Sequence, residues 1–226
     1  MANYEVDPDV LRDLVPSGTE LDFSSGRCFV SMVGFQFLDT RVLGIPVPFH
    51  RDFEEVNLRF YVRRRVNDEV RRGVVFVKEI VPRRALAWVA NALYNEKYVA
   101  LPMAHDDRIE TPSRSVAYRW QHAGAWCQLG LTLAGDAYLP DDTSEEAFIT
   151  EHYWGYTRQR DGSTLEYRVE HPRWNVWCAQ DPVFTCDVAS LYGPRFVPHL
   201  AKPPSSCFVA DGSEVLVRRG VALPRA

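Results

Sequence analysis

The stretch FHRDFEEVNLRFYVRR, residues 49–64, alternates apolar and polar side chains from residue 53 onward, as a half-buried β-strand does. In an extended chain the even positions 54–62 are mostly apolar, whereas Glu55, Asn57 and Arg59 share the opposite face. That polar face is either an ordinary solvated surface or the lining of a barrel interior, because a barrel that encloses a ligand needs polar groups pointing inward. This strand alone leaves both interpretations open.

The next strand, RRGVVFVKEIVP at residues 71–82, is apolar on both faces except at Lys78 and Glu79. A strand with two apolar faces is covered on both sides, which favours an interior position for its neighbour as well. Burying a lysine is costly, so Lys78 reaches solvent, pairs with a carboxylate such as Glu55, or loses its proton. The last alternative would make Lys78 a candidate amine nucleophile or base.

The remaining pattern predicts many strands and few helices. Strands are predicted near residues 27–38, 52–65, 70–81, 114–121, 125–133, 151–159, 163–171, 173–178 and 206–218. Four short helices are predicted: one capped by Asp7 before Pro8, one opened by Pro82, one from Thr143, and one over 187–192 that ends at Gly193. Because these helices do not alternate regularly with strands, we expect an α+β protein that is mostly β, a curved antiparallel barrel with peripheral helices.

The composition is that of an ordinary globular chain of 226 residues, 46% hydrophobic and 25% charged, which fits one domain over residues 1–226. A net charge of −4 provides no basic field for nucleic acid. The stretch MANYEVDPDV lacks the apolar core of a secretory signal, and no run approaches the roughly 20 apolar residues of a membrane span. We therefore expect a cytoplasmic protein without a nucleic-acid or membrane partner, and a homo-oligomer stays open.

Familiar metal and cofactor motifs do not occur in the sequence. The five cysteines are scattered without a C-x-x-C pair, which indicates reduced thiols and excludes a zinc ribbon. His50, Asp52 and Glu54 form H-x-D-x-E, yet the flanking prolines predict a turn, and no H-x-H pair accompanies it. Because G-x-S-x-G, P-loop and G-x-G-x-x-G motifs are missing, the sequence argues against serine hydrolases of that type and nucleotide enzymes. We expect no metal and no cofactor.

Six phrases of the sequence resemble the YqjF-like family of uncharacterised bacterial proteins: LVPSGTELD, GIPVPFHRDFEEVNLRFYV, RGVVFVKEIVPR, LYNEKYVALPM, EHYWGYTR and YRVEHPRWNVW. Together they cover most of the chain. That family is in turn similar, at a distance, to acetoacetate decarboxylase, whose fold is a curved antiparallel barrel closing over a small, largely apolar cavity. The resemblance thus implies the β-rich fold that the strand pattern predicts.

The resemblance also implies a set of site positions. Acetoacetate decarboxylase forms a Schiff base between a lysine of depressed pKa and its ketone substrate. Its pocket residues fall here on Glu55, on Ser31, on Met103 and on either Glu96 or Lys97. Glu55 matches a pocket glutamate, a second acidic residue is lost at Ser31, and the catalytic lysine is replaced by Met103. The decarboxylase reaction therefore cannot run as in the relative unless Lys78 or Lys97 supplies the amine.

An enzyme is the first of three functions that these observations leave open. It would act on a small carbonyl or carboxylate compound, with Glu55 and Lys78 as catalytic candidates and Arg59 or Lys78 binding an anion. Its pocket walls would come from two segments dense in aromatic residues, EHYWGYTRQ and LEYRVEHPRWNVW, which we expect to form a hairpin. The wall candidates there are His152, Tyr153 and Trp174.

The other two functions need no turnover. In a binding module, the same polar groups would fix the orientation of a small-molecule ligand. In a structural or partner-binding protein, Glu55 would pair with Arg59 or Lys78, and Glu79 with Arg168, as an internal ionic network. Whether the protein is an enzyme is not decided by the sequence, because a fold hosts many functions.

Overall fold

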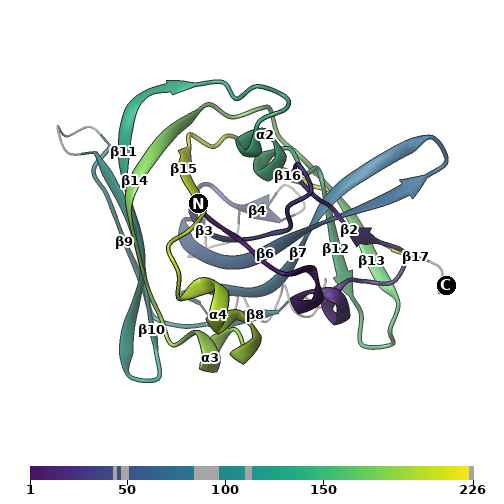
Figure 1. Ribbon diagram of the computed structural model, residues 1–226, viewed down its shortest axis with the longest axis horizontal. Coiled ribbons are helices and arrows are strands. Elements are labelled where there is room, and N and C mark those ends of the chain that lie inside the picture. The colour runs from purple at the N-terminus through teal and green to yellow at the C-terminus, as the bar shows by residue number, and fades with distance from the viewer. Residues whose placement is uncertain (43–44, 47–50, 84–96, 110–113, 224–226) are drawn as a thin grey trace.

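The computed structural model describes residues 1–42, 45–46, 51–83, 97–109 and 114–223. Most of them belong to one curved sheet of 15 strands (Figure 1). Along its main path the strands run β16 (Leu216–Val217), β13 (Thr164–Glu170), β12 (Trp154–Arg158), β7 (Glu69–Val81), β6 (Phe53–Val66), β3 (Phe29–Phe37), β1 (Ala2–Glu5), β15 (Ser206–Ala210), β14 (Val176–Thr185), β11 (Ala125–Tyr138), β10 (Ser115–His122) and β9 (Met103–Asp107). Beside this path, β2 (Glu20–Leu21) pairs with β6, β8 (Tyr98–Ala100) with β7, and β17 (Val221–Leu223) with β13, while β4 (Arg41–Val42) and β5 (Ile45–Pro46) form a separate pair.

Short helices flank the sheet, and polar caps start several of them. They are α2 (Glu145–Thr150), α3 (Val188–Leu191), α4 (Val197–Leu200) and the 3₁₀ turns Pro8–Val10, Arg12–Leu14 and Pro194–Phe196. The side chains of Asp7, Ser144 and Asp187 each accept a hydrogen bond from a backbone N–H of the first turn, as N-caps do. The predicted helices at these three places are confirmed, whereas the one opened by Pro82 lies largely outside the described residues. Among the described residues, no helix is both long and apolar enough to cross a membrane.

Strand β1 holds the two halves of the sheet together. Its residue Ala2 pairs with Met32 of β3 on one side and with Cys207 of β15 on the other. The half from β3 to β16 and the half from β15 to β9 therefore meet along the β1–β15 seam, at the centre of the main path.

The sheet curls so that β9 and β10 turn over one face of β3 and β6. The Nδ1 atom of His105 in β9 lies 2.7 Å from Oε1 of Glu54 in β6. The Tyr118 ring of β10 packs so closely on Gly34 of β3 that a Cβ at this glycine would overlap the ring. Among the described residues, however, the end strands β16 and β9 do not pair with each other. The predicted β-rich class is confirmed, while the predicted closure into a barrel is not.

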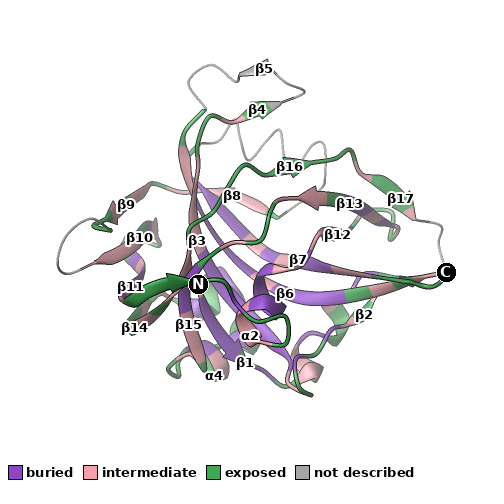
Figure 2. Ribbon diagram, turned by 90° about the horizontal axis from the view of Figure 1, so that it is seen from above, coloured by how far each residue is buried: buried purple, intermediate pink, exposed green. Residues whose placement is uncertain are grey.

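Apolar side chains pack on both faces of β6. We call the face toward β9 and β10 the inner face; it carries Val56, Leu58 and Phe60, which are fully buried in the larger core cluster together with Trp120. The outer face carries Glu55, Asn57, Arg59 and Tyr61, and its apolar part packs against α2 through Phe148 and Ile149. Figure 2 shows the buried residues concentrated along β3, β6 and β7. Strand β6 is thus covered on both faces, as its doubly apolar neighbour predicts.

Eight of the nine predicted strands are confirmed in place. The ninth, over 206–218, is wrong as a single strand, because it divides into β15 and β16, which lie at separate places in the sheet, and several further strands were not predicted. Strand β14 extends to Thr185, beyond the predicted end at residue 178. Strands β1, β8 and β9 are absent from the prediction because they are short and carry no clear alternation. The short α4 occupies part of the proline-rich stretch 199–206, which lacks a helical pattern in the sequence.

Candidate functional site

A row of polar side chains crosses three strands on the outer face. Asn57 of β6 pairs with Glu79 of β7, and Glu79 pairs with Tyr98 of the parallel strand β8. Glu55 lies two residues before Asn57, so the alternation of strand side chains places it on the same face. The register therefore gathers two carboxylates, an amide and a phenol; we call these four residues the Glu55 site.

The Glu55 carboxylate is removed from solvent and accepts hydrogen bonds from Asn57 and Tyr98. Glu55 is only 1% exposed. Asn57 Nδ2 donates a hydrogen bond to Oε1 over 2.9 Å, and the Tyr98 hydroxyl donates to Oε2 over 3.1 Å. Each oxygen thus accepts from a side chain fixed in the sheet, which orients the carboxylate plane.

Glu79 brings a second buried carboxylate to the same face. It is also 1% exposed, and it occupies the position directly opposite Asn57. Glu55 and Glu79 are therefore diagonal neighbours, whose Cα atoms in a regular sheet are about 7–8 Å apart. The register therefore places two buried carboxyl groups on neighbouring strands of the same face.

Aromatic rings stand next to Glu55 on the same face. Phe35 of β3 is its cross-strand partner. The Phe35 ring lies 4.9 Å from that of Phe37, which in turn lies 4.8 Å from that of Phe53. These three rings give the carboxylate an apolar border on one side, and such a border strengthens electrostatic interactions by lowering the local dielectric.

A second polar row lies one step further along the outer face. Asn3, Ser31 and Arg59 are aligned across β1, β3 and β6. Ser31 Oγ donates to Asn3 Oδ1 over 2.7 Å and accepts from the Tyr61 hydroxyl over 2.6 Å. Arg59 Nη2 donates to the Ile149 carbonyl of α2 over 3.1 Å. Ser31 and Arg59 thus share the face of Glu55, with Arg59 directed toward α2.

His152 is buried in a separate cluster next to α2. Its Nε2 lies 3.3 Å from Oδ2 of Asp22, the same oxygen that accepts a 2.7 Å hydrogen bond from Arg72 Nε. Burial lowers the pKa of His152 to about 4, and the nearby charge of Arg72 adds to this against the opposing effect of Asp22. Burial alone would raise the pKa of Asp22, but its contacts with His152 and Arg72 bring it down to about 2.

The imidazole of His152 is therefore neutral at pH 7 and packs as an aromatic ring. It lies 4.7 Å from the Tyr61 ring and 5.0 Å from the Phe148 ring, measured between centroids. Tyr61 connects this cluster to Ser31.

The other predicted site residues lie apart from Glu55. Lys78 pairs with Leu58, so alternation directs it to the inner face; a bulge at Val77 sets this register. Met103 pairs with Trp120 and packs on the larger core cluster.

Tyr153 and Trp174 form a third group. Trp174 stacks on His171, with centroids 4.1 Å apart, and the Tyr153 ring lies 4.9 Å from the same imidazole. Glu96 and His50 fall outside the described residues. Arg168 Nε lies 3.5 Å from Oε1 of Glu170, two residues further along β13.

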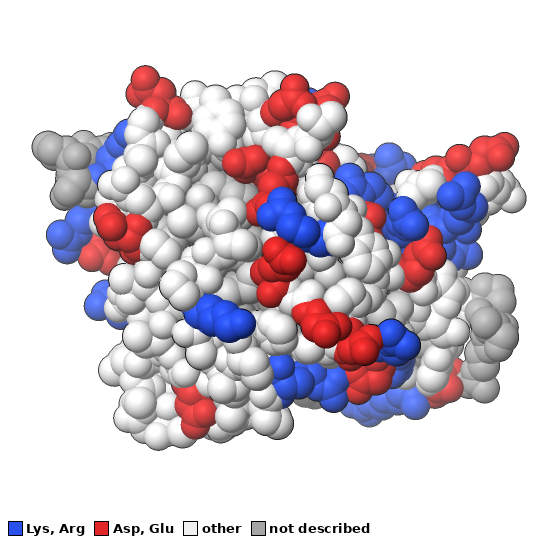
Figure 3. All heavy atoms as spheres, in the orientation of Figure 1, with Lys and Arg blue, Asp and Glu red and all other residues white. Residues whose placement is uncertain are grey.

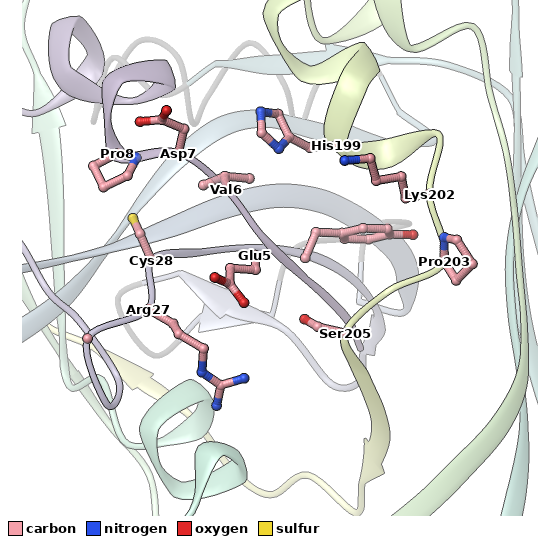
Figure 4. Close-up of a pocket in the computed structure, with 12 residues that line it drawn as sticks. Glu5, Val6, Asp7, Pro8, Arg27, Cys28, His199, Lys202, Pro203 and Ser205 are labelled. Atoms are coloured by element: carbon pink, nitrogen blue, oxygen red, sulfur yellow. The ribbon is translucent and has the colours of Figure 1, made fainter.

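Two open hollows lie along β1, and neither is lined by Glu55. One has a volume of about 630 Å³ and is bordered by Glu5, Asp7, Arg27, His199 and Lys202 (Figure 4). The other, about 700 Å³, is lined among others by Tyr4, Phe184, Cys186, Leu200 and Lys202. Figure 3 shows acidic and basic side chains intermixed on this side of the molecule. In the described part of the chain, no group of three or more His, Cys, Asp and Glu side chains is arranged to hold a metal ion.

The chain is similar in sequence to a known protein family. A family model described as an uncharacterized conserved protein, DUF2071, matches residues 1–214. The chain belongs to the DUF2071 family. It is similar to the uncharacterized protein YqjF of Bacillus subtilis (strain 168), with 27% identity over 196 residues, which is 85% of this chain and 77% of that protein. The family that the sequence phrases indicate is thereby confirmed.

Solved structures with this fold are acetoacetate decarboxylase-like. An acetoacetate decarboxylase-like enzyme from Sphingomonas wittichii RW1 aligns with a TM-score of 0.64 at 14% identity, over 100% of this chain and 90% of its own. Acetoacetate decarboxylase from Legionella pneumophila aligns with a TM-score of 0.64 at 11% identity, over 99% and 83%. The enduracididine biosynthesis enzyme MppR, complexed with pyruvate, aligns with a TM-score of 0.60 at 13% identity, over 91% and 79%. At these identities the likeness establishes the fold alone.

The sequence pattern predicts Glu55 and Arg59 as pocket residues, but it does not predict the complete Glu55 site. Asn57 is visible as a neighbour on the polar face, and Glu79 stands out as a charge in an apolar strand. Their alignment with Tyr98 depends on the bulge at Val77 and on the parallel pairing of β7 with β8, neither of which has a sequence pattern.

Proposed function

We propose that this protein is an enzyme that moves a proton on a small carbonyl or carboxylate compound, with Glu55 as the general acid or base. The observation that supports it is the Glu55 site itself: a buried carboxylate that accepts hydrogen bonds from Asn57 and Tyr98, with a second buried carboxylate on the neighbouring strand. Burying two carboxylates is costly for a structural role alone, since apolar side chains would stabilise the sheet as well or better.

Each residue of the Glu55 site has a role in the proposal. Glu55 takes a proton from the carbon next to a carbonyl, or returns one to it, because a positioned carboxylate in a dry setting is an effective base. Asn57 and Tyr98 are positioning residues that hold the carboxylate plane. Glu79 receives or supplies the proton between turnovers. The border of Phe35, Phe37 and Phe53 keeps water from competing.

The proposal does not include a Schiff base. The resemblance puts Met103 at the position of the catalytic lysine. Of the two lysines that could replace it, Lys78 points to the face opposite Glu55, whereas Lys97 directly precedes Tyr98 and is the amine that a trapped adduct would identify. Enolisation of a keto acid, or an addition or elimination next to its carbonyl, needs proton transfer but no covalent amine. A neighbour of this fold is described in complex with pyruvate, a small keto acid, which makes this substrate class the first to test.

For domain organisation, cellular location and partners, the proposal keeps what the sequence predicts. We infer one domain over the whole chain that works in the cytoplasm on a small-molecule ligand. Acidic and basic groups are intermixed on the face seen in Figure 3, which agrees with a protein that does not bind nucleic acid through its overall charge. An oligomer remains open.

Exchange of carbon-bound hydrogen tests the proposal directly. The protein is incubated in deuterated water with pyruvate and other small keto acids. NMR follows the loss of the signal from the hydrogens on the carbon next to the keto group. We expect the native protein to accelerate exchange for at least one compound and Glu55→Gln to reduce that rate about 100-fold or more. The matched control is Glu54→Gln, which changes the neighbouring carboxylate on the inner face and leaves the rate within about twofold.

Three results would speak against this function. An equal rate for the native protein and Glu55→Gln, both folded by their melting curves, would remove Glu55 as the base. Ligand-induced stabilisation of the native protein without any exchange would favour a binding module. A covalent adduct trapped by borohydride would restore the Schiff-base mechanism through a lysine.

A further inference from the structure

Two of the cysteines face each other across neighbouring strands. In the antiparallel pair of β11 and β14, Gln128 is opposite Thr185 and Leu129 is opposite Phe184. Continuing that register by one residue places Cys127 opposite Cys186, directly after the end of β14. Residues directly opposite in such a pair have Cα atoms about 4.5 or 5.5 Å apart. This lies within the range of about 4.4–6.8 Å that a disulfide requires.

Both side chains also point to the same side of the sheet. Cys127 is buried within the larger core cluster, and Cys186 packs against that cluster from its margin. Burial, and after it contact with the Cys127 thiol, raises the pKa of Cys186 well above its usual value. The register thus makes the two thiols cross-strand neighbours, whereas neither is bonded to another cysteine.

One of the two thiols is within reach of small molecules. Cys186 is only partly buried, and it lines the 700 Å³ hollow beside Asp187 and Lys202. Cys127 lies behind it. A reagent that enters the hollow thus meets Cys186 first, and Cys127 stands ready to attack the sulfur that has been modified.

We propose that Cys127 and Cys186 are a redox modification site that forms a reversible disulfide with a low-molecular-weight disulfide as oxidant. In the first step Cys186 loses its proton to solvent, and its sulfur attacks the oxidant, forms a mixed disulfide and releases one thiol; because the pKa of Cys186 is raised, this step becomes faster as the pH rises. In the second, Cys127 attacks the Cys186 sulfur and releases the other thiol. Two protein thiols are oxidised, the oxidant is reduced to two thiols, and the two protons go to these products.

The bond would fix the start of α3. Asp187 follows Cys186 and caps this helix, its Oδ1 accepting a 3.1 Å hydrogen bond from Ser190 N. A disulfide to β11 therefore ties the cap of α3, and with it one wall of the hollow, to the sheet.

The other cysteine pair on neighbouring strands serves as a comparison. Cys178 is opposite Phe208, so Cys207 is offset from it by one residue and points to the other side of the sheet. Cys207 Sγ donates instead to the Ala179 carbonyl over 3.1 Å. We expect no bond between these two cysteines in the folded protein.

Peptide mapping after oxidation tests the proposal. The folded native protein is incubated with oxidised glutathione, alkylated under denaturing conditions without reductant, digested and analysed by mass spectrometry. We expect a peptide pair linking Cys127 to Cys186, with the loss of two hydrogens, that disappears after dithiothreitol. Cys127→Ser should instead accumulate glutathione on Cys186, and the control Cys178→Ser should form the link as the native protein does.

Three outcomes would overturn it. These are full alkylation of both Cys127 and Cys186, a glutathione adduct that stays on Cys186 of the native protein, and a link that joins Cys178 to Cys207 in its place. All three leave the Glu55 proposal untouched, because the two cysteines lie on the opposite side of β6 from the Glu55 site.

Discussion

We expect acid to destabilise this protein through the buried imidazole of His152, in addition to the buried amino group of Met1. His152 is shielded by Tyr61 and Phe148, and its side chain is 1% exposed. Because burial lowers its pKa from 6.5 to about 4, the folded protein keeps the imidazole neutral where the unfolded chain already binds a proton. Stability due to this difference is fully present above pH 6.5, and it is lost progressively as the pH falls toward 4.

The size of the effect follows from the two pKa values. Between pH 6.5 and 4 the unfolded state holds about one proton more than the folded state at this position, so the free energy of unfolding falls by about 1.4 kcal/mol per pH unit. Over the whole window the loss is on the order of 3 kcal/mol. Asp22, with a pKa of about 2, adds its own loss only below pH 4.

Urea unfolding at several pH values between 7.5 and 4 measures this loss. Replacing the imidazole in His152→Phe keeps an aromatic ring between Tyr61 and Phe148, so the variant should lose about 3 kcal/mol less than the native protein over the same window. His171→Phe, at the partly buried ring that stacks on Trp174, is the matched control and should follow the native curve. Parallel curves for the native protein and His152→Phe would refute the assignment of the neutral imidazole.

Two further predictions concern the architecture. Gly34→Ala places a methyl group into the Tyr118 ring, so the free energy of unfolding should fall by about 1–3 kcal/mol; an unchanged urea midpoint would show that β10 does not pack on β3 in this way. Glu166→Ala leaves Arg64 and Arg71, which contact its two oxygens at 3.1 and 2.7 Å, without this acceptor, and should cost about 2 kcal/mol. The exposed Glu20→Ala, which removes one ion pair with Arg63, should cost less than about 1 kcal/mol in the same unfolding assay; equal losses for the two variants would contradict the buried role of Glu166.

The strand pattern predicts what local periodicity controls. The alternation of residues 53–62 assigns each side chain of β6 to its face correctly, since a pleated strand has a period of two residues. The caps at Ser144 and Asp187 also appear in place, because capping depends on a few neighbouring residues.

What the pattern does not predict depends on pairing between distant segments. The bulge at Val77 decides that Lys78 faces away from Glu55, and one residue of slip reverses the face of every side chain beyond it. Tyr98 joins the Glu55 site only through a three-residue strand. Closure of the sheet is likewise a long-range property, and the curvature expected for a barrel is present without pairing of β16 to β9 in the described chain.

The seam between β1 and β15 gives this protein a particular order of assembly. Ala2 and Cys207 are partners, so β1 is synthesised about 200 residues before β15, the strand that covers its second edge. Until then β1 is an unprotected edge on an otherwise formed half-sheet, a site at which other chains can pair. Contacts so distant in sequence also slow folding. A nascent chain of this protein is therefore most vulnerable to aggregation in the interval before β15 has been made, and a chaperone that shields β1 would act within that interval.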